Sequence, residues 1–342
     1  MLKYKTLGIH RKCVELSTDK MRLLVTTEVG PRIIGCFIGK DKANQFVQLP
    51  AKPMPQPANG FTLYGGHRLW HSPEECPLCY EPDNTPVKVT EYESGVEFAG
   101  KADPKTGIAK KILVEPLTNG LFCVTHTIEN GGVWPVELAP WALTMMAPGG
   151  MAVIPQGRDD EGYPYLPDRK LAVWAYSDLK DPRLELGHDF ILLKQDTKAK
   201  TNLKIGLNDE SGWIAYVNGG TAFVKYFDYD CEGEYPDGGC SIESYTCSKF
   251  TEIETLGTLQ ELEPGECAQH VEYWQGIDGL PQIATEADVA EHLVARLLAS
   301  EESCCCDDDC CCDDECDDDC DCHCHEAEEK PARKSRKAAA KK

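Results

Sequence analysis

The sequence lacks the features that would place it in a membrane or on nucleic acid. No stretch of its 342 residues approaches 18 consecutive apolar residues, and the first six residues contain no apolar signal-peptide core. The formal net charge of −22 argues against binding to nucleic acid or an anionic membrane, because like charges repel. We therefore expect a cytoplasmic protein with neither as a partner, and with its cysteines as thiols. The sequence leaves the oligomeric state open.

Helical periodicity is also missing before residue 284. Short runs rich in β-branched and aromatic residues occur instead, separated by turn signals such as Asn130-Gly131-Gly132. The predicted strands are 21–27, 32–38, 95–99, 108–114, 121–128, 171–176, 190–194, 203–206, 213–217, 222–227, 242–246, 250–256 and 270–274. This pattern excludes a parallel β-α-β fold and predicts an all-β protein built as a sandwich of large antiparallel sheets.

One helix is predicted near the end of this body, from Thr285 to about Ala299. Thr285 and Asp288 have the spacing of a capping box, and the apolar residues that follow fall on one helical face. Residues 1–300 are predicted to form one domain, and residues 301–342 a low-complexity tail that cannot bury enough apolar surface to fold. Of the tail, residues 301–329 carry 15 acidic and no basic residues, whereas residues 330–342 carry 7 basic and no acidic ones.

The tail holds 10 of the 19 cysteines, interleaved with Asp and followed by His. Thiolate and imidazole together suit Zn²⁺ or Cu⁺, so the tail is a candidate metal site, whereas the body is expected to need no cofactor. The candidate ligands are Cys304, Cys305, Cys306, Cys310, Cys311, Cys312, Cys316, Cys320, Cys322, His323, Cys324 and His325. The alternative is an acidic repeat that binds metal in solution without a biological purpose.

Within the body, the segment from Tyr64 to Glu74 concentrates the side chains that bind polar ligands. His67, Arg68, Trp70 and His71 follow a Gly-Gly pair, which permits a tight turn. Guanidinium and imidazole donors beside an indole suit a ligand with many hydroxyls and one apolar face, such as a small-molecule sugar. The alternative is a buried Trp surrounded by satisfied polar groups.

Four motifs, in this order, resemble the galactose-mutarotase-like (aldose 1-epimerase-like) superfamily over roughly residues 5–280. They are Gly65-Gly66-His67-Arg68-Leu69-Trp70, Trp141-Ala142-Leu143-Thr144, Gly212-Trp213-Ile214-Ala215-Tyr216, and Glu254-Thr255 leading into Leu262-Glu263-Pro264-Gly265-Glu266. The resemblance implies a β-supersandwich that binds a sugar in an open groove. It also implies an isomerase that interconverts α and β anomers without a metal, through a paired general base and general acid.

By motif position the base falls on Glu254, and Glu252 is the competing choice because it shares the same strand face. The family's acid is a His on a central strand, but the matching stretch, residues 137–143, contains none. His67 or His71 would have to serve instead. His126 lies on an apolar strand face and is interpreted as a core residue.

The resemblance suggests three further ligand-binding candidates. Lys204 is a candidate donor, which would matter more for a phosphorylated or acidic sugar. Trp213 and Tyr216 are candidate stacking residues, of which only one can face the groove because they are three apart on a strand. Three hypotheses follow: a sugar epimerase with Glu254 as base, a non-catalytic sugar-binding protein that lost the acid, and a metal-sequestering protein that works through its tail.

Overall fold

The computed structural model describes residues 2–39, 43–56, 58, 60–76, 78–157 and 165–297. Residues Met1–Val294 make up one compact unit. The predicted metal ligands of the tail lie outside the described residues, so that prediction stays open. Among the described residues, no helix combines the length and apolarity needed to cross a membrane.

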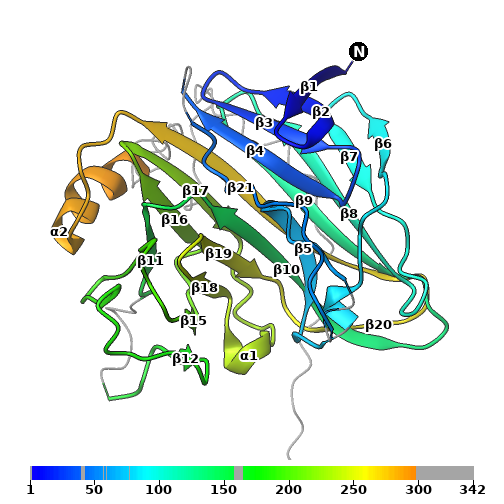
Figure 1. The fold of residues 1–342 in the computed structure, drawn as a ribbon. Helices are drawn as coiled ribbons and strands as arrows, with labels where there is room; N and C mark the ends of the chain where they lie inside the picture. The colour runs from blue at the N-terminus through cyan, green and yellow to red at the C-terminus, as the bar shows by residue number, and fades with distance from the viewer. Residues whose placement is uncertain are drawn as a thin grey trace, which may run out of the picture. The chain divides into compact units, whose positions relative to one another are not determined.

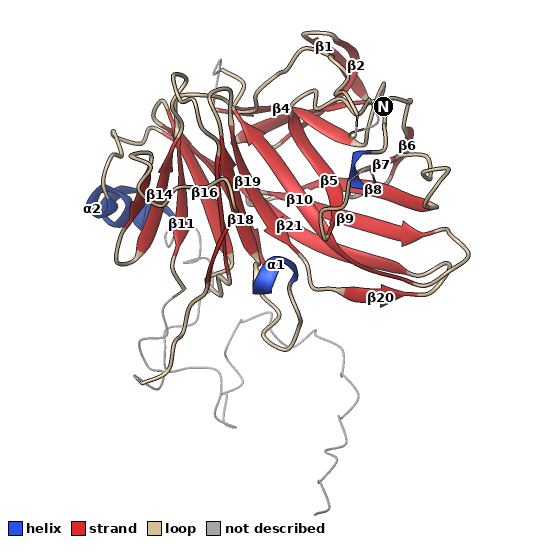
Figure 2. Cartoon of the chain, turned by 60° about the horizontal axis from the view of Figure 1, so that its bottom comes forward, coloured by secondary structure: helices blue, strands red, loops and turns tan. Residues whose placement is uncertain are grey.

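The unit consists of two large sheets whose paired strands are all antiparallel (Figures 1 and 2). The first sheet has eleven strands in the order β1-β2-β3-β4-β5-β10-β19-β18-β15-β12, with β20 paired to β10. Its strands are β1 (Lys3–Leu7), β2 (His10–Ser17), β3 (Met21–Thr26), β4 (Arg32–Ile38), β5 (Gly66–Ser72), β10 (Val136–Met146), β12 (Leu171–Val173), β15 (Leu203–Leu207), β18 (Ile242–Thr246), β19 (Thr251–Leu256) and β20 (Gln260–Leu262).

The second sheet has ten strands in the order β13-β14-β11-β16-β17-β21-β9-β8-β7-β6. They are β6 (Lys88–Glu91), β7 (Val96–Ala99), β8 (Ile108–Pro116), β9 (Phe122–Asn130), β11 (Met151–Pro155), β13 (Leu184–Leu186), β14 (Phe190–Lys194), β16 (Trp213–Asn218), β17 (Thr221–Phe227) and β21 (Cys267–Asp278). The predicted all-β antiparallel sandwich is therefore confirmed.

Helical structure is short in the described chain. It comprises η1 (Leu78–Tyr80), α1 (Pro236–Gly239), α2 (Glu286–Asp288) and the π-helical turn η2 (Val289–Val294). The predicted capping box is present: the Thr285 hydroxyl accepts from the Asp288 amide, and the Asp288 carboxylate accepts from the Thr285 amide. The predicted helix therefore starts where expected, and its buried residues include Val289, Leu293 and Leu297.

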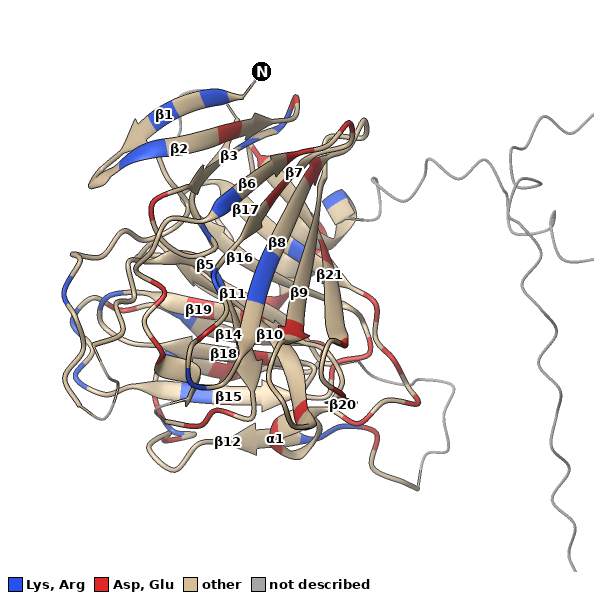
Figure 3. Cartoon of the chain, turned by 90° about the vertical axis from the view of Figure 1, so that its right-hand side faces the viewer, with Lys and Arg blue, Asp and Glu red and all other residues tan. Residues whose placement is uncertain are grey.

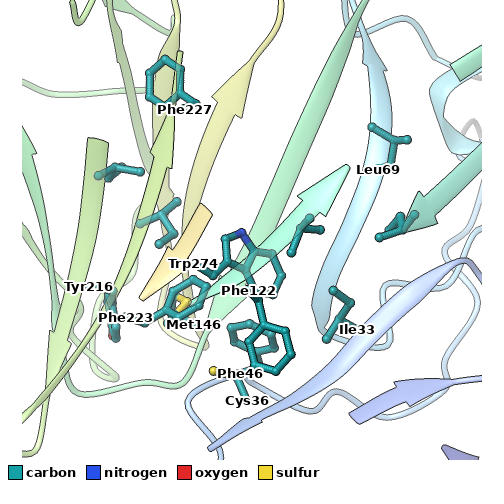
Figure 4. Close-up of a cluster of buried hydrophobic side chains, with 14 of the residues drawn as sticks. Ile33, Cys36, Phe46, Leu69, Phe122, Met146, Tyr216, Phe223, Phe227 and Trp274 are labelled. Atoms are coloured by element: carbon teal, nitrogen blue, oxygen red, sulfur yellow. The ribbon is translucent and has the colours of Figure 1, made fainter. Parts of the chain in front are cut away.

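The hydrophobic core lies between the two sheets and draws on both of them (Figure 4). Phe46, Phe223 and Trp274 meet edge to face at its centre, with ring centroids 5.1 to 6.0 Å apart. Aromatic pairs in this arrangement stabilise a core beyond the effect of the area they bury. This packing fixes the first sheet on its inner face and leaves the other face of the central strands free to form a site.

Candidate functional site

A pocket of about 310 Å³ lies on the face of the first sheet that points away from the second. Its floor comes from five adjacent strands, β5, β10, β19, β18 and β15. Their register aligns the side chains in rows, because Leu143 pairs with both Arg68 and Glu254, while Tyr245 pairs with both Glu252 and Lys204. Segments far apart in the sequence thus meet at one concavity.

Strand β5 is oriented by the glycine pair that precedes it. Gly65 and Gly66 have φ values of +91° and +71°. A Cβ atom on Gly65 would lie 2.0 Å from the Val47 carbonyl oxygen, and one on Gly66 would lie 2.3 Å from that of Ile33. The glycines are therefore required for close approach to neighbouring backbone, and the turn they make directs Arg68 and Trp70 into the pocket.

Two cations of the pocket are held by carboxylates. Arg68 Nη1 lies 2.9 Å from Glu252 Oε1. Lys204 Nζ lies 3.1 Å from Glu254 Oε2 and 2.5 Å from Glu243 Oε2. Acidic positions on β18 and β19 lie near basic positions on β5 and β15 (Figure 3). The pairs are nearly or fully buried, so their charges are only weakly screened by solvent.

Burial and charge act in opposite directions on these groups. Burial raises the pKa of Glu252, and Glu254 raises it further, while Arg68 lowers it; the net shift is upward. The pKa of Glu243 lies well above its usual range, mainly because of burial. Burial alone would lower the pKa of Lys204, but Glu254 and Glu243 reverse this and hold it above its ordinary value. Lys204 is therefore a firmly charged ammonium.

Glu254 is fully buried, and only one of its two carboxylate oxygens is hydrogen-bonded among the described residues. Its Oε2 accepts from Trp141 Nε1 at 2.8 Å and from Lys204 Nζ at 3.1 Å. Its Oε1 has no hydrogen-bond partner among the described residues. A carboxylate held by two donors through one oxygen keeps its orientation, and its second oxygen can still accept a hydrogen bond.

Aromatic side chains form the walls. Trp141 and Trp174 sandwich the Lys204 ammonium, which lies 4.5 Å from each ring centroid, and the Arg68 guanidinium lies 4.3 Å from the Trp70 ring. The sequence analysis did not assign a site role to several lining residues, namely Met54, Leu63, Glu74, Tyr80, Trp141, Leu143, Trp174, Tyr176, Asn202, Tyr245 and Phe250.

His67 is not in the pocket. It precedes Arg68 on the same strand and therefore faces the opposite way, into the space between the sheets. Its Nδ1 lies 2.8 Å from Thr144 Oγ1 and its Nε2 lies 2.7 Å from His126 Nε2, and burial lowers its pKa well below the usual range. The expectation that His67 serves as the acid at the sugar is thus corrected by the geometry. His126 is a bonded core residue, as interpreted from sequence.

His67, His126 and Glu272 place three metal-ligating atoms within 4.8 Å of one another. Two imidazole nitrogens that share a tetrahedral zinc at about 2.0–2.1 Å lie roughly 3.3 Å apart. The 2.7 Å between the two Nε2 atoms is instead the length of a direct hydrogen bond. The charge of Glu272 is already matched by Lys225, whose Nζ lies 2.5 Å away. The cluster is therefore a bonded polar network that ties the sheets together.

The other sequence-predicted residues divide between the pocket and elsewhere. Arg68, Trp70, Lys204, Glu252 and Glu254 line the pocket together. His71, Trp213 and Tyr216 do not line it. His71 lines a separate cavity of about 410 Å³ and has a pKa lowered by burial to about 3.

Trp213 and Tyr216 belong to β16 of the second sheet. Trp213 packs near Phe190, with ring centroids 6.1 Å apart. Tyr216 is fully buried, and its hydroxyl donates to the Ala147 carbonyl at 2.7 Å. The prediction that one of them faces the groove is wrong, because their strand lies in the sheet that does not form the pocket.

Comparison with known proteins shows which solved structures have a similar fold. No family model and no curated protein matches the sequence. A putative aldose 1-epimerase from Klebsiella pneumoniae is similar in structure, with a TM-score of 0.54, 14% identity, and coverage of 87% of this chain and 86% of the other. A galactose mutarotase-like protein from Clostridium acetobutylicum is similar with a TM-score of 0.51 and 11% identity, over 81% and 98% of the two chains.

A TPR-domain containing protein from Parabacteroides distasonis is also similar, with a TM-score of 0.53 and 13% identity over 80% of this chain; this chain spans about half of its length, 49%. Identities this low show the fold alone. The chain thus has the galactose-mutarotase-like fold, as its motif order indicated.

Proposed function

We propose that this protein binds a reducing sugar in the 310 Å³ pocket and interconverts its anomers, with Glu254 as the general base. The observation that carries the proposal is the convergence of Arg68, Trp70, Lys204, Glu252 and Glu254 on one aromatic-walled concavity. Indole and phenol faces suit the apolar face of a pyranose, and the charged groups suit its hydroxyls. The unpartnered Oε1 of Glu254 would accept the proton of the anomeric hydroxyl.

The charge balance of the pocket favours a sugar without a phosphate. Arg68 and Lys204 are both paired with carboxylates of this chain. A phosphate would have to displace those carboxyl groups, or else lie near Glu254 and be repelled by its charge. Neutral hexoses should therefore bind more tightly than their 6-phosphates, which titration calorimetry with both forms would measure.

The decisive assay is polarimetry of freshly dissolved α-glucose and α-galactose with the full chain. The wild-type protein should accelerate the approach to anomeric equilibrium, and Glu254→Gln should abolish the acceleration while the fold, followed by circular dichroism, is kept. Glu185→Gln serves as a control, because Glu185 is an exposed carboxylate on β13, outside the pocket. A Glu254→Gln variant with the full rate would remove Glu254 from the role of base.

A second candidate function is non-catalytic sugar binding. It is favoured by one observation: among the described residues that line the pocket, none is a histidine. If the wild-type protein binds sugars in calorimetry without any acceleration over buffer, sugar binding alone is the function.

A further inference from the structure

Strand β19 places two carboxyl groups in the pocket, whereas the resemblance implies a carboxylate and an imidazole. Glu252 and Glu254 are two residues apart on β19, so both point to the same face. A rise of about 3.3 Å per residue places their Cα atoms roughly 7 Å apart, which is enough to flank the reacting edge of a pyranose. The two groups differ in their partners and in their exposure, and those differences assign the roles.

Glu254 is the more strongly held anion. Two donors, Trp141 Nε1 and Lys204 Nζ, bond to its Oε2, and its side chain is fully buried. The Glu252 side chain is bonded by Arg68 and retains 10% exposure. Burial and the neighbouring Glu254 raise the pKa of Glu252, so protonation of Glu252 costs less than it would for an ordinary surface carboxyl.

The other protic side chains of the pocket are poor donors at neutral pH. The Lys204 ammonium is held by two carboxylates, which raise its pKa. Burial raises the pKa of the Tyr176 phenol to about 12. The imidazoles of His67 and His71 are both outside the pocket. Between the two carboxyl groups of β19, Glu252 is thus the better suited to give a proton to a ring oxygen.

We propose that Glu252, acting with Glu254, is the general acid of this site, so that a pair of carboxyl groups performs the ring opening. The inference rests on the proposed function. Glu254 removes the proton from the anomeric O1, and the O–H electron pair forms the C1=O bond. The C1–O5 bond breaks, and O5 takes the proton of Glu252. After rotation about C1–C2, O5 attacks C1 from the other face, Glu252 recovers its proton, and Glu254 returns one to O1.

The test compares wild type, Glu252→Gln, Glu254→Gln and the control Glu185→Gln by polarimetry across pH 4–9, with sugar affinity from calorimetry. Glu252→Gln should lower kcat by roughly 10²- to 10⁴-fold, the usual contribution of a positioned acid, while changing the sugar Kd by less than about threefold. Wild-type kcat should fall on the alkaline side as Glu252 loses its proton, and the residual rate of Glu252→Gln should lack this limb.

Two results would overturn the inference separately. A Glu252→Gln variant with wild-type kcat, or with the alkaline limb unchanged, would exclude Glu252 as the acid while the epimerase function stands. A wild-type protein that binds sugar without accelerating anomer exchange would remove the epimerase function itself, and the role of Glu252 with it. A parallel loss of kcat and of sugar binding in Glu252→Gln would make Glu252 a binding residue instead.

Discussion

A buried ion pair behind β19 allows the energetics of the sandwich to be tested quantitatively. Lys225 Nζ lies 2.5 Å from Glu272 Oε1 and donates to the Ala142 carbonyl at 2.9 Å, so it links the two sheets. Both side chains are fully buried. Burial acts to raise the pKa of Glu272, but Lys225 and the neighbouring imidazoles lower it by more, so the net pKa lies below 4.5.

The downward shift of the Glu272 pKa determines how the stability of the fold depends on pH. A carboxyl whose folded pKa is depressed stabilises the protein above its unfolded pKa, and this stability is lost as pH falls through the folded pKa. In Lys225→Met the ammonium is removed at similar side-chain volume. The influence of burial then dominates, so the variant should lose stability as pH rises above 4.5, opposite to the contribution of Glu272 in the wild type.

The magnitude is set by the cost of protonating Glu272 instead of burying its charge. Protonating a carboxyl of ordinary pKa 4.5 costs about 1.36 kcal/mol for each pH unit above 4.5. This free energy is about 3.4 kcal/mol at pH 7 and about 0.7 kcal/mol at pH 5. The first value agrees with the roughly 3–5 kcal/mol typical of a broken buried pair. The loss of unfolding free energy in Lys225→Met should therefore grow by about 1.4 kcal/mol per pH unit between pH 5 and 7.

Urea unfolding of wild type and Lys225→Met at pH 5, 6 and 7 measures this difference. Lys194→Met is the matched control, because Lys194 pairs with Glu185 at 3.3 Å on the surface, where both side chains are about half exposed. That control should change stability by less than about 1 kcal/mol and show little pH dependence. A Lys225→Met loss that is large but constant with pH would show that packing, and not charge compensation, explains the cost.

Two further predictions concern the pocket and the tail. Trp141→Phe removes the Nε1 donor to Glu254 but keeps an aromatic wall. A hydrogen bond to a charged group is worth about 1.5–3 kcal/mol, so kcat for anomer exchange should fall by roughly tenfold or more. An unchanged kcat would contradict the importance of that bond. In the tail, the cysteines and histidines between residues 304 and 325 can be replaced by Ser and Ala. This variant should bind less Zn²⁺ per full-length chain, as measured by elemental analysis after dialysis. Equal metal content would refute the tail as the binding site.

The fold class was predictable because short runs rich in β-branched and aromatic residues, separated by turn signals, mark many of the strands. Strand β10 was not predicted, although it is central in the first sheet. Its residues from Leu138 to Met146 are all buried, so alternation is missing, and Pro140 argues against a central strand. The structure resolves the conflict: β20 pairs with residues 136–138 and β19 with residues 141–146, so Pro140 lies between two partners, where its missing N–H is tolerated.

The site was predictable in part, and for a geometric reason. A spacing of two on a strand places Glu252 and Glu254 on one face, and this could be derived from the sequence. The same alternation separates Arg68 and Trp70 from His67 and His71, but only once residues 66–72 are recognised as a strand. The glycines before that segment favoured a loop interpretation, in which all four side chains could contact one ligand. The predicted strand 171–176 is too long: β12 ends at Val173, and Trp174 and Tyr176 come from irregular chain after it.

Strand β19 shows how one element can carry the charges of a site. Glu252 and Glu254 would repel each other in a poorly solvated pocket if both were charged; Lys204 compensates the charge of Glu254, and Arg68 holds Glu252 in place. On the inner face, Thr255 bonds to His270 at 2.7 Å and to Glu272, which anchors the strand to the second sheet. The two carboxyl groups are thus fixed from both sides of the sheet before any ligand binds, and a fixed pair is what proton transfer at a sugar requires.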